Sequence, residues 1–288
     1  MRAIVHDRYG SPDSLRIATA EVPTTRDDEV LVRVAATSVH VDIWHVVVGL
    51  LYALRLTGAG LLRPRDRVPG TDVAGVVESF GPAVSRLRAG DEVMGETGCG
   101  IQWRNGGAWA ELASASEDGL VLKPAALTFE EAAAVGTPAV LAYEVLLDQA
   151  GLRAGQSLLV NEAGGGMGLW VVQLAVALGA SRVVGVDHPD KLELLRVATG
   201  AHAGWHVRPR GSRPVRAGMN RWTGSIGGVL GNSLLAPFHR QLPGVRRSTP
   251  RAERLAHLAR LLCWRQVRCG PWSTGCSPWS RRSRRCGT

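Results

Sequence analysis

Short apolar segments alternate with polar, turn-forming clusters over residues 1–127. The apolar segments RAIVH, EVLVRVAAT and VAGVVESFG are rich in β-branched residues, and clusters such as YGSPDS and PTTRDD separate such segments. Gly, Pro, Asp and Ser favour turns, and a strand about every ten residues is typical of a small barrel. The pattern therefore predicts a β-barrel-like domain over residues 1–127, with no helix before Thr128.

The pattern changes at Thr128. Two glutamates follow it closely, which is a helix start signal, and an Ala- and Leu-rich segment then continues to Gly151. The next segment, QSLLVNEAGGGMGLWVVQLAVALGASRVVGVD, predicts a strand, a glycine turn, a helix over Leu169–Leu178 and a second strand. This order predicts a Rossmann-type dinucleotide-binding domain over residues 128–244. Further apolar strands are missing after about residue 197, so the domain is predicted to be incomplete.

The glycine turn matches the dinucleotide fingerprint with Ala163 in the first glycine place, Gly165 in the second and Gly168 in the third. A small first residue permits the tight turn, the second glycine lets the backbone approach a pyrophosphate, and the third lets the helix lie close to the strand. The pyrophosphate would lie at the N-terminus of the helix. The predicted cofactor-binding residues of the turn are Ala163, Gly165, Gly166, Met167 and Gly168. The alternative is a glycine-rich turn with a purely structural role.

Asp187 ends the second strand, 19 residues after Gly168. A carboxylate there would accept hydrogen bonds from the adenosine ribose and would repel a 2′-phosphate. The sequence therefore predicts NAD(P)H as the cofactor, with a slight preference for NAD(H). His188 and Lys191 lie beside Asp187 and would offset part of that repulsion.

The net charge of +9 is unevenly distributed along the chain, because the excess of basic residues lies in the C-terminal part. Residues 1–199 carry 17 Lys and Arg against 24 Asp and Glu, whereas residues 200–288 carry 17 Arg and one acid, Glu253. Four of the five cysteines also lie in the second part, which leaves Cys99 alone in the first. A single cysteine argues against a disulfide scaffold, and we find no signal-like or membrane-spanning segment. We expect a cytoplasmic protein without a membrane partner.

Four motifs follow one another over about residues 1–197: MRAIV, VPGTDVAGVVESFGPAVSRLRAGDEVMG, GGAWAELASASEDGLVLKPAALTFEEAAAV and LLVNEAGGGMGLWVVQLAVALGA. In their order and spacing they resemble the medium-chain dehydrogenase/reductase superfamily, in its quinone oxidoreductase-like and zinc-type alcohol dehydrogenase-like branch. The resemblance implies an α/β fold with an added β domain: a GroES-like barrel substrate domain followed by a truncated Rossmann domain, with hydride transfer between them. It also implies a small-molecule substrate, and a homodimer where the Rossmann domain is intact.

The resemblance allows a test for zinc from residue types. Zinc enzymes of the superfamily carry a Cys just before the Asp of the segment Ser38–Asp42, and Gly-His-Glu where Gly70, Thr71 and Asp72 stand. Neither metal-binding residue is present, and Cys99 lacks the companions that a four-cysteine structural site needs. We therefore expect no metal.

Without a metal, a substrate carbonyl or enone must be polarised by side chains, water or the nicotinamide ribose. The resemblance places four candidates on the segment that lines the active site: His40, Asp42, Trp44 and His45. We take His40 and Asp42 as the catalytic candidates, with structural roles as the alternative for both. Thr137 is expected to face the nicotinamide, although Leu141 stands where relatives carry a Thr.

The C-terminal third departs from the family pattern. Val267–Thr288, written in GC-rich codons and read one base earlier, gives an apolar and acidic sequence that resembles the family's closing substrate-domain segment. We therefore predict a one-base frameshift between about Leu258 and Cys263, and we interpret residues 245–288 as an aberrant basic tail in place of that segment. The alternative is a real basic tail whose tryptophans, interleaved with arginines, stack on nucleic-acid bases.

The sequence thus predicts a zinc-independent, NAD(P)H-dependent oxidoreductase that transfers hydride to a quinone, enone, aldehyde or ketone. Because its later strands and closing segment are altered, we expect little activity from the chain as written. One alternative is a non-catalytic protein that binds a cofactor or a partner. The other is a nucleic-acid-binding tail on a relic dehydrogenase; we do not expect a nucleic-acid partner, since that tail contains no Lys.

Overall fold

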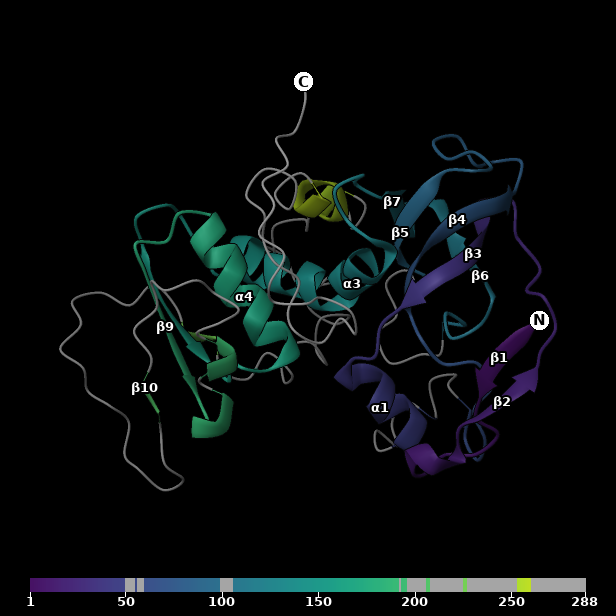
Figure 1. Cartoon of the computed structure of the whole chain (residues 1–288), viewed down its shortest axis with the longest axis horizontal. Helices are drawn as coiled ribbons and strands as arrows, with labels where there is room; N and C mark the ends of the chain where they lie inside the picture. Colours follow the sequence, from purple (N-terminus) through teal and green to yellow (C-terminus); the bar gives the residue numbers. More distant parts are fainter. Residues whose placement is uncertain are drawn as a thin grey trace, which may run out of the picture.

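The structure is a computed structural model that describes residues 1–49, 55, 60–98, 106–191, 193–195 and 253–259, with the backbone of residues 206–207 and 225–226. Cys99 and the Arg-rich segment from Cys263 onward lie outside the described residues. Figure 1 shows two bodies of strands, an antiparallel one formed by the first part of the chain and a parallel one formed by the middle.

The N-terminal body confirms the strand pattern read from the sequence. Five antiparallel strands pair in the order β6-β3-β4-β5-β7, and β1 pairs with β2. Val30 and Val32 on β3 pack with Val73 and Val77 on β4 in the barrel core. The elements of this body, with the helix α1 treated below, are β1 (Arg2–Val5), η1 (Pro12–Ser14), β2 (Arg16–Thr19), β3 (Glu29–Thr37), β4 (Asp72–Phe80), β5 (Glu92–Glu96), β6 (Leu112–Ser116), η3 (Glu117–Gly119) and β7 (Leu120–Leu122).

The prediction that no helix precedes Thr128 is wrong, because helix α1 (Val41–Val48) follows β3. Its sequence, VDIWHVVV, is rich in β-branched residues, which favour strands. The segment is helical because one face buries side chains such as Ile43 and Val47. Gly49 ends the helix in the left-handed conformation, with φ of 68°.

The second body confirms the predicted βαβ unit. Strands β8 (Ser157–Asn161) and β9 (Arg182–Asp187) are parallel neighbours joined through helix α4 (Gly166–Ala177). Two-residue strands extend the sheet to the order β10-β9-β8-β11, beyond what the sequence predicts after residue 197. These strands are β10 (His206–Val207) and β11 (Ser225–Ile226), and the short turn η5 (Pro189–Lys191) follows β9.

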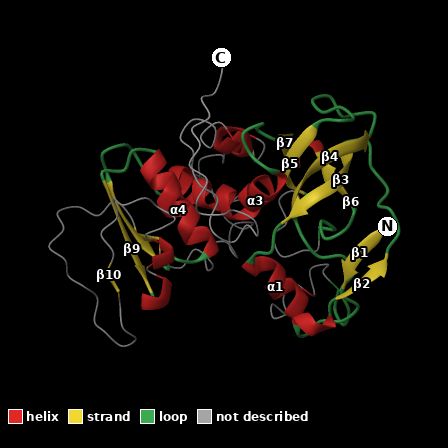
Figure 2. Ribbon diagram, in the orientation of Figure 1, coloured by secondary structure: helices red, strands yellow, loops and turns green. Residues whose placement is uncertain are grey.

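Helix α3 (Phe129–Tyr143) connects the two bodies and begins where the sequence predicts. Thr128 caps it, and Thr128 and Glu131 exchange hydrogen bonds in a capping box. The π-helical turn η4 (Glu144–Gln149) follows α3 directly. Helices α3 and α4 lie between the two bodies of strands in Figure 2, and their buried side chains share one core with Ala74 and Met94 of the barrel.

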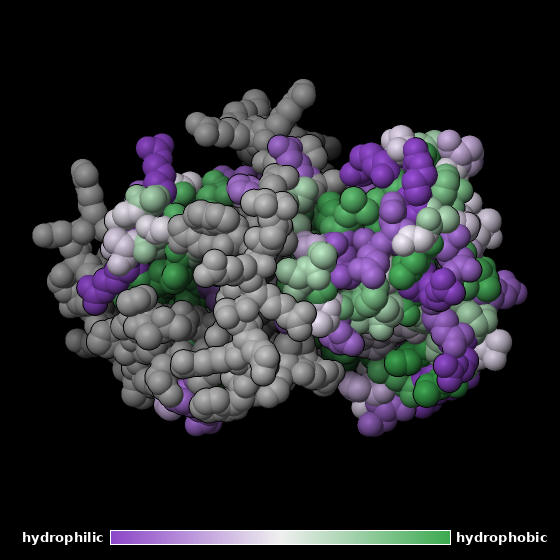
Figure 3. Space-filling model, turned by 45° about the horizontal axis from the view of Figure 1, so that its top comes forward, coloured by the Kyte–Doolittle hydropathy of each residue, from purple (hydrophilic) through white to green (hydrophobic). Residues whose placement is uncertain are grey.

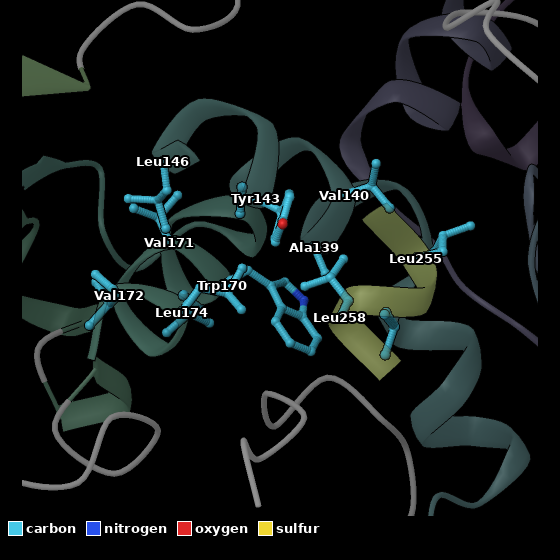
Figure 4. Close-up of a cluster of buried hydrophobic side chains, with 14 of the residues drawn as sticks. Ala139, Val140, Tyr143, Leu146, Trp170, Val171, Val172, Leu174, Leu255 and Leu258 are labelled. Atoms are coloured by element: carbon cyan, nitrogen blue, oxygen red, sulfur yellow. The ribbon is translucent and has the colours of Figure 1, made fainter. Parts of the chain in front are cut away.

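Residues 253–259 form a helix in this shared core. The interpretation of residues 245–288 as an aberrant basic tail stays a prediction, because the other residues of that segment lie outside the described ones. Leu255 and Leu258 are completely buried, and Figure 4 shows them close to residues of α3. Arg254 forms ion pairs with Glu144 at 2.7 Å and Asp148 at 2.8 Å. The spacing of the two leucines gives the helix an apolar face. This face packs into the core although the neighbouring sequence is rich in arginine.

The surface of the barrel mixes residues of both kinds. On the face shown in Figure 3, hydrophilic and hydrophobic residues are interspersed over the N-terminal body. Within the described part of the chain, no helix combines the length and the apolar character needed to cross a membrane.

Candidate functional site

The glycine turn between β8 and α4 is tightly built on one side and open on the other. Glu162 adopts φ of 57°, and a Cβ on Gly168 would lie 2.4 Å from the Glu162 carbonyl oxygen. Only glycine fits there, as the fingerprint requires for close packing of helix and strand. Gly166 is exposed, and a Cβ added to it would meet no atom within 4 Å. The turn therefore has room beside its backbone at the start of α4.

The N-terminus of α4 carries no side-chain cap. Gly165 is the N-cap residue, and no side-chain hydrogen bond caps the helix. The first-turn amides of a helix have no acceptor within it, and the helix dipole favours negative charge at this end. An uncapped helix start beside an open glycine backbone fits a phosphate group of a dinucleotide.

The other two predicted residues of the turn face inward. Ala163 is buried, and its amide donates to the carbonyl oxygen of Val186 at 3.3 Å. Met167 is partly buried and packs against the core of the second body. Their side chains therefore shape the turn from inside.

Asp187 lies at the end of β9, as predicted, but its carboxylate turns into the glycine turn. One oxygen accepts from the Gly164 amide at 2.6 Å, and the other accepts from the His188 amide at 2.6 Å. Lys191 Nζ lies 3.4 Å from Asp187 Oδ1. The side chain is only 6% exposed, because these donors hold it against the backbone. Asp187 thus links β9 to the turn, whatever it contributes to ribose binding.

The two catalytic candidates lie together at the start of α1. His40 is the N-cap residue of α1, and Asp42 is its second residue. His40 Nδ1 lies 3.9 Å from Asp42 Oδ2, and His40 Nε2 lies 2.9 Å from Thr71 Oγ1. Burial raises the pKa of Asp42, the nearby His40 and His45 oppose that shift, and Asp72 adds to it. The pair therefore combines an imidazole with a carboxyl group whose pKa is raised by burial.

Thr137 is hydrogen-bonded to the buried carboxylate of Asp72. Its amide donates to Asp72 Oδ1 at 2.8 Å, and its hydroxyl donates to the same oxygen at 2.7 Å. The helix α3 is broken at Gly136, where a Cβ would lie 2.4 Å from Asp72 Oδ1. The break lets the carboxylate approach the backbone. The predicted contact of Thr137 with nicotinamide stays a prediction. Leu141, further along the helix, is partly buried.

The structure adds Ser38, Thr71 and Asp72 to the residues around His40. Asp72 is completely buried, and the Ser38 hydroxyl donates to its Oδ2 at 2.5 Å. The sequence analysis considers Thr71 and Asp72 only in testing for zinc. The available signal was a carboxylate at the start of the apolar strand DVAGVV, because a charge is rarely buried without partners.

The remaining candidates of this segment are less enclosed. Trp44 is 44% exposed and contacts the His45 ring edge-on. His45 Nδ1 lies 2.9 Å from the Val41 carbonyl oxygen, within the same helix. In the described ranges, no three His, Cys, Asp or Glu side chains are grouped so that they could hold a metal ion.

Comparisons with known proteins agree with this architecture. The alcohol dehydrogenase GroES-like domain family matches residues 26–125. The 2-methylene-furan-3-one reductase of Solanum lycopersicum is 36% identical over 202 residues, which are 68% of this chain and 50% of that protein. The quinone oxidoreductase of Homo sapiens is 32% identical over 203 residues, which are 70% of this chain and 57% of that protein.

A solved structure gives the same result. A structure described as an NAD-dependent alcohol dehydrogenase has a TM-score of 0.62 and 31% identity, and the match covers 72% of this chain and 63% of that one. The chain thus spans about half to three fifths of the length of the relatives it matches. The matched region includes the elements that carry both the glycine turn and the His40 cluster.

Proposed function

Because the chain belongs to the medium-chain dehydrogenase/reductase superfamily, in its quinone oxidoreductase-like branch, we propose that it is an NAD(P)H-dependent oxidoreductase. Its acceptor would be a quinone, an enone, an aldehyde or a ketone, reduced without zinc. The observation that carries the proposal is the open, uncapped start of α4 in a chain whose barrel domain brings the partly buried His40 within 3.9 Å of the buried Asp42.

The cofactor would be held by the backbone of the second body. Gly166 and the first-turn amides of α4 would face a pyrophosphate, while the Gly165 amide donates to the Glu162 carbonyl oxygen at 3.1 Å. The bound dinucleotide supplies the hydride. A slight preference for NAD(H) is part of the proposal, since the Asp187 carboxylate opposes a 2′-phosphate. Lys191 limits that preference because its ammonium group lies 3.4 Å from the carboxylate.

The barrel domain would supply the proton. Reduction of a carbonyl or an enone leaves negative charge on the substrate, which a nearby acid neutralises. His40 is the candidate donor, since its ring is 12% exposed and has polar partners at both nitrogens. Asp42 Oδ2 lies 3.9 Å from Nδ1 of this ring.

The zinc-independent part of the proposal rests on residue types. Gly70, Thr71 and Asp72 stand where zinc enzymes carry Gly-His-Glu, and Thr71 Oγ1 is hydrogen-bonded to His40. A cytoplasmic location belongs to the same proposal, as does a homodimer formed through the sheet edge where the Rossmann domain is intact. Their support is the single cysteine outside the C-terminal part and the family resemblance.

Titration of the purified 288-residue chain with NADH and NADPH, followed by nucleotide fluorescence, tests the cofactor site. We expect saturable binding, followed by turnover with at least one member of a panel of quinones, enones and aldehydes. Binding of neither nucleotide at millimolar concentration would refute the proposal. Binding without turnover across the panel would favour a non-catalytic cofactor-binding protein.

Low activity of the written chain is a further part of the proposal. A chain with the reading frame restored after residue 258 provides the comparison. We expect the restored chain to turn over faster at equal nucleotide occupancy. Equal rates of the two chains would show that the basic segment does not impair the enzyme.

A further inference from the structure

Asp72 is a completely buried carboxylate at the first position of β4. Three hydrogen bonds reach it: Oδ1 accepts from the Thr137 amide and hydroxyl, and Oδ2 accepts from the Ser38 hydroxyl. Burial of a charged group without such donors would be costly. The donors come from two separate parts of the chain, α3 on one side and the loop before α1 on the other.

The α3 side of this contact is a specific distortion of the helix. Gly136 has φ of −28° and ψ of −118°, which are not helical values, and Pro138 follows two residues later. A Cβ at residue 136 would overlap the Asp72 carboxylate. The break therefore brings the Thr137 amide to Asp72 rather than to a carbonyl of its own helix. Asp72 of the barrel is thereby fixed to the first helix of the dinucleotide-binding body.

The other side of the contact leads to the proton donor. Ser38 lies two residues before His40, and His40 Nε2 is 3.9 Å from Asp72 Oδ2. The charged groups that face His40 are Asp42 from α1 and Asp72 from β4, and His45 acts on Asp42 from the same helix. The imidazole thus lies between two carboxylates.

We infer that Asp72 is a positioning residue for His40, which it holds in place by joining the Ser38 loop to the break in α3 at Thr137. The inference rests on the proposed function, in which His40 gives the proton. Its consequence is that the position of the donor in the barrel depends on a side chain of the dinucleotide-binding body. Displacement of a reacting group by about 1 Å costs up to about a hundredfold in rate.

Two variants remove single donors and keep the carboxylate: Ser38→Ala and Thr137→Val. Ser114→Ala is the matched control, because it removes a hydroxyl–carboxylate hydrogen bond of 2.9 Å to Glu29 elsewhere in the barrel. Each variant is made in the full chain and compared by thermal melting, nucleotide fluorescence, kcat, KM and the imidazole ¹⁵N signals of His40, assigned with His40→Gln.

We expect Ser38→Ala and Thr137→Val to shift the His40 signals and to lower kcat by about tenfold, with nucleotide affinity changed less than about twofold. Thr137→Ser should restore both readouts, and Ser114→Ala should change neither. Unchanged His40 signals in both donor variants would overturn the inference, as would a kcat within twofold of the unmodified chain. Failure of the chain to bind nucleotide would refute the proposed function instead, while the ¹⁵N signals still decide the positioning of His40. If either donor variant does not fold, the other one decides.

Discussion

Replacement of Leu258 by Ala should destabilise the whole fold, although this residue lies in the basic C-terminal part of the sequence. The side chain is completely buried in the core that α3 and α4 share, which also contains Ala139 and Trp170; all three are labelled in Figure 4. Truncation of a buried Leu to Ala costs about 2–5 kcal/mol, because it removes apolar contacts and leaves a cavity. At roughly 2–4 °C for each kcal/mol, the melting temperature should fall by about 4–20 °C.

Thermal unfolding followed by circular dichroism measures this effect. The matched control is Leu62→Ala, which truncates a leucine that is 84% exposed and should change the melting temperature by less than about 2 °C. If both variants melt together with the unmodified chain, then residues 253–259 do not form part of the core. In that event the interpretation of this segment as an aberrant tail would stand.

Three further predictions concern the site. Gly168→Val should abolish nucleotide binding and destabilise the turn, because the valine side chain would overlap the Glu162 carbonyl. Gly166→Ala is the control and should fold normally, since an added Cβ meets no atom there. Equal melting temperatures of the two variants would contradict this prediction. Burial raises the pKa of Asp42 above 3.8, so the folded protein holds that proton more tightly and loses stability as pH rises from about 3.8 through the raised value. In urea unfolding, the free energy of unfolding of Asp42→Asn should therefore rise relative to that of the unmodified chain over this pH range. A difference between the two free energies that stays constant between about pH 3 and about pH 7 would refute the reasoning. Dialysed protein should contain less than about a tenth of an equivalent of zinc by elemental analysis, and a stoichiometric amount would overturn the zinc-independent proposal.

Local signals in the sequence were sufficient for much of the fold. The capping box at Thr128 and the glycine turn before α4 are patterns within a few residues, and both are present in the structure. The segment Val41–Val48 shows the limit of such signals, because its β-branched residues suggest a strand. Its helix depends on a buried face and on the terminal Gly49, which are tertiary and conformational effects. Similarly, the arginines around residues 253–259 obscured a short amphipathic helix.

The cluster around His40 was less predictable because its contacts join distant parts of the chain. Asp72 is 34 residues from Ser38 and 65 residues from Thr137, and no spacing rule relates positions so far apart. The resemblance supplied His40 and Asp42 but did not indicate that Thr137 binds Asp72. A buried carboxylate needs hydrogen-bond donors. The position of Asp72 at the start of an apolar strand therefore indicated that such donors exist, but it did not say which residues supply them. The break at Gly136 identifies one of these donors. Gly136 is the only described residue of α3 with non-helical backbone angles, and the amide of the next residue, Thr137, donates to Asp72.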